Sequence, residues 1–122
     1  MFEWGGRNPD GTDGFARNRP GWAAPIHQLL VRNKVSIVFH GHDHLYAKQD
    51  LDGIVYQEMP QPGAPGNGRV PRSAAEYGYK NGVILGSSGH LRVAVSDGQV
   101  KVEYIGTDQA VAHAYVVPAG SS

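Results

Sequence analysis

The 122-residue chain contains no cysteine, and only 18% of its residues are charged. The absence of cysteine excludes a disulfide framework, thiol catalysis and cysteine-ligated zinc, so any metal site must use histidine, carboxylates or carbonyls. Lysine plus arginine equals aspartate plus glutamate at 11 each, which excludes the basic surface that nucleic acid or an acidic membrane would require. No run approaches 18 consecutive apolar residues and no secretory signal pattern opens the sequence, so we expect a soluble, cytoplasmic protein.

Glycine and proline are abundant instead, with 17 and 8 residues. Such a composition excludes an all-helical bundle and predicts many turns. The length fits a single domain over 1–122. Residues 1–21 show no periodicity and predict a surface loop, and residues 59–80 predict a long loop rich in proline and glycine.

The first half of the chain has an α/β pattern. Ile26, Leu29 and Leu30 are spaced as on one face of a short helix over 25–32, after Pro25 at its first turn. The apolar run over 35–40 predicts a strand that is covered on both faces. A polar link and a second strand over 53–58 follow.

The second half predicts antiparallel strands. Apolar residues alternate over 91–95 and over 100–104, and the Asp97-Gly98 pair between the two runs is typical of a hairpin turn. Short strands are also expected over 83–85 and 112–117. The predicted class is α/β (α+β): a β-rich, sandwich-like half domain with one short helix, a mixed sheet and a C-terminal antiparallel hairpin.

Chemistry is concentrated where the first apolar strand ends, because His40, His42 and His44 alternate there around Asp43. In an extended backbone, residues two apart point the same way, so imidazoles at this spacing can converge on a metal ion. One interpretation is a single-chain site of the three histidines with an open water position. The other is a solvated polar loop.

The segment Val35-Ser-Ile-Val-Phe-His-Gly-His-Asp-His-Leu-Tyr46 resembles the Gly-His-x-His end of the calcineurin-like metallophosphoesterases. The resemblance implies that His42 ligates one metal of a two-metal site and that His44 ligates the other. It extends over most of the chain as the C-terminal half of such a domain. The family's Asp-x-His, Gly-Asp-x-x-Asp and Gly-Asn-His motifs do not occur in the sequence.

The resemblance implies a metal-dependent hydrolase that uses a divalent ion, Zn, Mn, Fe or Ca. Hydroxide on the metal would attack a phosphoester. By their proximity in sequence to His42 and His44, and not by the resemblance, Asp43 or His40 is the candidate catalytic group that orients water or protonates the leaving group. One alternative is the hydrolysis of a carboxylic ester or lactone. Another is a non-catalytic fragment that binds metal or associates with itself, and a homo-oligomer would cover an exposed sheet face.

The remaining polar residues are weaker candidates. Arg7, Arg17 and Arg19 could bind an anionic substrate, but a solvated loop is the favoured interpretation. His27 and His113 are predicted to be half-buried packing residues.

Overall fold

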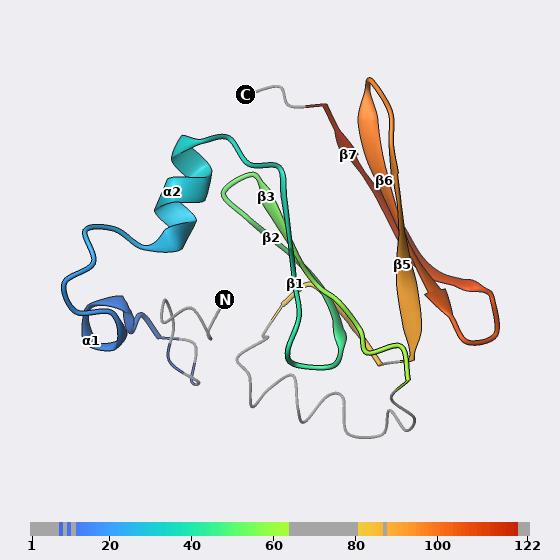
Figure 1. The fold of residues 1–122 in the computed structure, drawn as a ribbon, viewed down its shortest axis with the longest axis horizontal. Coiled ribbons are helices and arrows are strands. Elements are labelled where there is room, and N and C mark those ends of the chain that lie inside the picture. Colours follow the sequence, from blue (N-terminus) through green and yellow to red (C-terminus); the bar gives the residue numbers. More distant parts are fainter. Residues whose placement is uncertain (1–7, 9, 11, 64–80, 87, 120–122) are drawn as a thin grey trace.

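The computed structural model describes residues 8, 10, 12–63, 81–86 and 88–119, and within them it confirms the α+β class. Two short helices accompany strands that form two sheets, ordered β1-β3-β2-β4 and β5-β6-β7 (Figure 1). The elements are α1 (Phe15–Asn18), α2 (Ile26–Arg32), β1 (Ile37–His40), β2 (Tyr46–Leu51), β3 (Ile54–Glu58), β4 (Val83–Leu85), β5 (Gly89–Val95), β6 (Gln99–Gly106) and β7 (Val111–Pro118).

The first sheet lies between α2 and the second sheet (Figure 1). It is mixed, as predicted, because β1 runs parallel to β3 while β2 is antiparallel to both β3 and β4. The second sheet is wholly antiparallel. Tyr46 of the first sheet stacks on Tyr104 of the second with ring centroids 4.6 Å apart, so the two sheets pack as a sandwich.

The core is small and contains polar groups. It is centred on β3, in which every residue is buried, and on the first residues of β2. Where the sheets meet, the Tyr115 hydroxyl donates to Gln57 Oε1 at 2.9 Å, and the Tyr46 hydroxyl lies 2.6 Å from His113 Nδ1. These bonds satisfy polar atoms that burial would otherwise leave without water.

The helix predicted over 25–32 is confirmed at Ile26–Arg32, with Pro25 as its N-cap residue and Asn33 as its C-cap residue. Leu29, however, is 47% exposed, so part of the expected apolar face does not reach the core.

The prediction of a loop throughout 1–21 is wrong at α1. There the Asp13 carboxylate accepts the Phe15 N–H at 3.1 Å and satisfies a donor at the start of that turn.

The polar link expected between the two N-terminal strands is a strand, β2. Its polar residues lack a clear apolar alternation, so the sequence pattern does not mark it as a strand. It nevertheless forms a hairpin with β3, and the turn is Asp52-Gly53, with φ of 52° and 79°. An Asp-Gly pair at positive φ is the preferred two-residue hairpin turn. The same dipeptide signal that predicts the C-terminal hairpin was therefore present here too.

Strand β1 is not covered on both faces, contrary to expectation. It lies at the edge of its sheet, and Phe39 is 40% exposed. The doubly covered strand is β3, its parallel neighbour. A run of apolar residues identifies a strand but does not say which strand occupies the centre of the sheet.

The C-terminal predictions are confirmed: β4, the β5–β6 hairpin and β7 match the expected ranges within a few residues. Residues 64–80 of the predicted long loop and Arg7 of the arginine group lie outside the described residues. Within the described part of the chain, neither helix has the length and apolarity needed to cross a membrane.

Candidate functional site

The histidine loop, residues 41–45, leaves the carboxyl end of β1 and leads into β2. Because β1 and β3 are parallel and His40 pairs with Glu58 in their register, the carboxyl ends of both strands lie side by side at one end of the sheet. Carboxyl ends of parallel strands are where open α/β sheets place their ligand sites.

Glu58 fixes the start of this loop. Its side chain is fully buried, and its two oxygens serve two partners: Oε2 lies 2.5 Å from His40 Nδ1, and Oε1 accepts the Asp43 N–H at 2.8 Å. The Met59 N–H donates to the His40 carbonyl at 2.7 Å. A buried carboxylate with such partners holds the backbone on both sides of Gly41 in one place.

His42 and Asp43 form a second contact at the loop. The Nδ1 atom of His42 lies 3.1 Å from Asp43 Oδ1, and the His42 side chain is 75% exposed while that of Asp43 is 3% exposed. A carboxylate accepts only, so Nδ1 carries the hydrogen and Nε2 is the nitrogen with a lone pair. This is the arrangement in which carboxylates orient metal-binding histidines.

The backbone of the loop is not extended at the two histidines. His42 has φ of 119° and His44 has φ of 58°, values that non-glycine residues adopt rarely and at a cost of roughly 1–3 kcal/mol. The alternation of an extended strand therefore does not govern the direction of these imidazoles. Such strain persists where the surroundings impose it, and the Glu58 contacts supply that constraint.

The described residues do not form a complete metal site. In the part of the chain that the structure describes, no three His, Asp or Glu side chains are grouped so as to hold a metal ion. His40 faces Glu58 in the interior, with a side chain only 6% exposed. Exposed imidazoles at His42 and His44 have the donor chemistry that suits divalent transition metals, but two are fewer than the three protein ligands of a catalytic zinc site.

Sequence reasoning missed Glu58. It ends an apolar strand, Ile54 to Tyr56 followed by Gln57 and Glu58, and a carboxylate at that position is the available signal. The signal gains meaning only from the β1–β3 register, which places Glu58 beside His40.

No family model matches the chain, and no curated protein matches its sequence. Among solved structures, the chain is similar to a single mutant of Vps29 from Entamoeba histolytica, with a TM-score of 0.44 and 11% sequence identity. The likeness covers 86% of this chain and 52% of that chain, so this chain spans about half the length of Vps29.

Proposed function

We propose that His42 and His44 are two ligands of a divalent-metal site in a phosphoester hydrolase of the calcineurin-like metallophosphoesterase type. The observation that carries the proposal is the strained loop, which Glu58 anchors at the carboxyl end of β1 and which exposes both imidazoles. The described residues include no third His, Asp or Glu grouped with these two, so the proposed site requires further ligands.

Under this proposal, the residues of the loop have different roles, as metal ligands or as positioning residues. A divalent metal bound there would supply Lewis-acid activation of water and polarisation of the phosphoryl group. Asp43 accepts from His42 Nδ1 and so directs Nε2 outward as the coordinating atom. His40 and Glu58 hold the loop backbone, and their contact supports a positioning role for His40 rather than direct contact with substrate.

Metal binding is the first test. Zn²⁺ or Mn²⁺ is titrated into metal-free protein and followed by calorimetry and by the NMR signals of the imidazole ring hydrogens. His42→Ala and His44→Ala should each lower the affinity at least about tenfold. His90→Ala, which removes an exposed histidine from β5, is the matched control and should leave the affinity unchanged. Equal binding by all four proteins would contradict the assignment.

Hydrolysis is measured separately on a phosphodiester and on a lactone, with each metal added singly. Preference for the phosphodiester supports the proposal, whereas preference for the lactone favours the carboxylic ester alternative. Activity that persists unchanged in both histidine variants, or that is absent with every metal, overturns the catalytic part of the proposal and leaves a non-catalytic metal-binding chain.

The exposed edge of the first sheet favours a second candidate, association with another copy of the chain. Strand β1 is one of the two outer strands of the sheet, and its Phe39 is 40% exposed. None of the residues of α2 is fully buried, and Leu29 and Val31 are 47% and 40% exposed. Apolar side chains beside an unpaired strand edge are surfaces that another chain commonly covers.

A further inference from the structure

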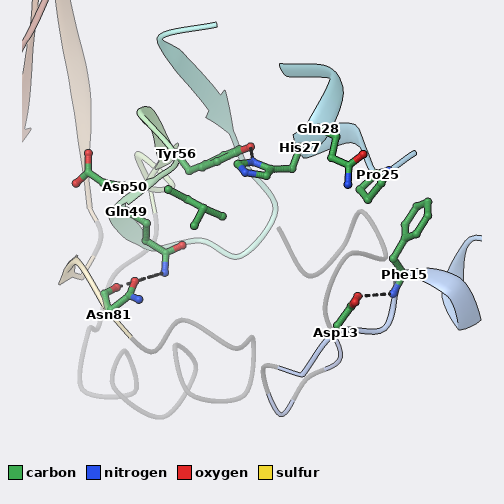
Figure 2. Close-up of a pocket in the computed structure, with 10 residues that line it drawn as sticks. Asp13, Phe15, Pro25, His27, Gln28, Gln49, Asp50, Tyr56 and Asn81 are labelled. Atoms are coloured by element: carbon green, nitrogen blue, oxygen red, sulfur yellow. Dashed lines mark hydrogen bonds between the residues drawn. The ribbon is translucent and has the colours of Figure 1, made fainter. Parts of the chain in front are cut away.

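A cavity of about 270 Å³ lies on the side of the first sheet opposite the second sheet. Figure 2 shows that its wall combines residues from the first helical region, from the start of α2 and from β2 and β3. Phe15, Pro25 and Leu51 give it apolar surface, and its polar lining includes Asp13, Gln49 and Tyr56. The volume suits a ligand smaller than most drugs.

Three residues distant in sequence form a hydrogen-bonded relay, and two of them, His27 and Tyr56, line this wall. His27 Nε2 lies 2.7 Å from Asp52 Oδ2, and His27 Nδ1 lies 2.5 Å from the Tyr56 hydroxyl. Asp52 can only accept, so Nε2 carries the hydrogen, and in the neutral imidazole Nδ1 accepts from Tyr56. The Tyr56 oxygen then has its lone pairs, and no hydrogen, to offer a ligand.

Burial keeps the Tyr56 hydroxyl protonated. Burial, and to a lesser extent the charge of Asp52, raises the pKa of Tyr56 above its ordinary value. The phenol is therefore a neutral, fixed acceptor rather than a nucleophile.

Like Tyr56, Gln49 has its donor occupied and its oxygen available as an acceptor. Gln49 pairs with Tyr56 across the β2–β3 register, so the two side chains are neighbours on one face of the sheet. Its Nε2 donates to the carbonyl and to Oδ1 of Asn81, at 3.3 and 3.2 Å. Figure 2 shows this nitrogen turned toward Asn81, which leaves Oε1 as the atom that can meet a ligand.

The charges around the cavity are negative. Asp13 and Asp50 line it, and in the described residues no lysine or arginine does. Lys48 partly compensates Asp50, because its Nζ lies 2.6 Å from Asp50 Oδ2. Asp13 accepts the Phe15 N–H, a neutral donor that leaves its negative charge in place. Among the lining residues that the structure describes, an anionic ligand would meet no fixed cation, whereas a ligand with only hydrogen-bond donors would match the oxygens.

We propose that this cavity binds a small organic cation, an ammonium group on a short apolar body. The Tyr56 and Gln49 oxygens accept from the ammonium group, Asp13 attracts its charge, and the body packs toward Phe15 and Pro25. This site is separate from the histidine loop and does not depend on metal binding there.

Benzylammonium chloride is the probe, titrated into the full chain and followed by amide NMR shifts, with benzyl alcohol and benzoate as the neutral and anionic counterparts. We expect benzylammonium to saturate the cavity with a Kd of about 1 mM, and benzyl alcohol and benzoate to bind at least about tenfold more weakly. Tyr56→Phe should weaken binding about tenfold and Asp13→Asn about threefold. Asp97→Asn, in the exposed hairpin turn, is the control and should change nothing.

Equal affinity for benzyl alcohol would overturn the proposal in favour of an apolar slot, and equal affinity for benzoate would show that the charge of the ligand is not recognised. Unsaturable shifts, or full affinity in Tyr56→Phe, would also overturn it. If circular dichroism shows that Tyr56→Phe is unfolded, Gln49→Ala takes its place, and a loss of about fivefold is expected. His42→Ala should bind benzylammonium normally, which separates this test from that of the metal site.

Discussion

At the scale of single residues, Glu58 does more than any other side chain to define the histidine loop. It is fully buried at the end of β3, and its two oxygens contact His40 and the backbone N–H of Asp43. A buried carboxylate is tolerated because its partners replace the water it loses. The candidate ligands themselves are exposed and contribute little to the core, so function and stability reside in different residues.

Glu58→Gln is expected to destabilise the chain by about 1–3 kcal/mol, because the amide keeps one acceptor for the Asp43 N–H but loses the charge that faces His40. Urea denaturation measures the difference. Glu103→Gln is the comparison variant: Glu103 pairs with Arg92 near the surface of the second sheet and should cost under about 1 kcal/mol. Similar losses in the two variants would remove the special role of Glu58.

His113 makes stability depend on acid pH. Burial, and secondarily the charge of Lys48, lowers the pKa of His113 in the folded chain, so the unfolded chain binds its proton first. Its contribution to stability is complete above the unfolded pKa of about 6.5 and is lost as pH falls below that value. His113→Gln should reduce the slope of stability between pH 5 and 7 by less than the roughly 1.4 kcal/mol per pH unit that one site allows. His90→Gln, at an exposed site, should retain the slope, and an unchanged slope in His113→Gln would refute the assignment.

At the scale of elements, the β2–β3 hairpin shows how turn chemistry outweighs side-chain pattern. Strand β2 contains Lys48, Gln49 and Asp50 and has little of the apolar alternation that marks a strand. It pairs with β3 because Asp52-Gly53 reverses the chain, and the pairing brings Gln49 beside Tyr56. The cavity wall is thus a product of that turn.

Gly53→Ala tests this turn. The added methyl would meet nothing within 4 Å, but φ at this position is +79°, so the cost is that of the backbone conformation alone, about 1–2 kcal/mol. Gly98→Ala, in the other Asp-Gly turn, also meets open space and is not held at positive φ, so it should change stability by less than about 0.5 kcal/mol. Chemical denaturation of both variants measures the contrast, and equal effects would show that the turn of β2–β3 is not strained.

At the scale of the whole molecule, tyrosines contact one another and polar groups between the two sheets, and β1 lies at an edge of its sheet with Phe39 exposed. Rings such as Tyr46 and Tyr104 bury large areas while their hydroxyls find partners in the opposite sheet or in the connecting segment. The opposite face bears the helix α2, which buries none of its residues fully. The exposed apolar side chains near β1 and α2 therefore offer a second copy area to cover.

Phe39→Glu should reduce self-association if copies meet at the β1 edge. Sedimentation velocity is expected to show a species heavier than the 13.1 kDa monomer for the unchanged chain and the monomer for the variant. The association constant of the variant should be at least about tenfold lower. Val95→Glu alters a valine that is 76% exposed in the second sheet and should associate normally. A monomer in all three samples would exclude this mode of assembly.

Local physics alone determined much of this protein. Pro25 and the helical spacing after it predict α2, and period-two alternation with Asp97-Gly98 predicts the C-terminal hairpin. The alternating histidines identify the candidate loop after β1. These features depend on residues within a few positions of one another. Tertiary structure alone decided which strand is central, which carboxylate anchors the histidine loop, and that His27 joins Tyr56 and Asp52. Those contacts link residues 15 to 29 positions apart, so they depend on sheet register and helix placement, which no local pattern encodes.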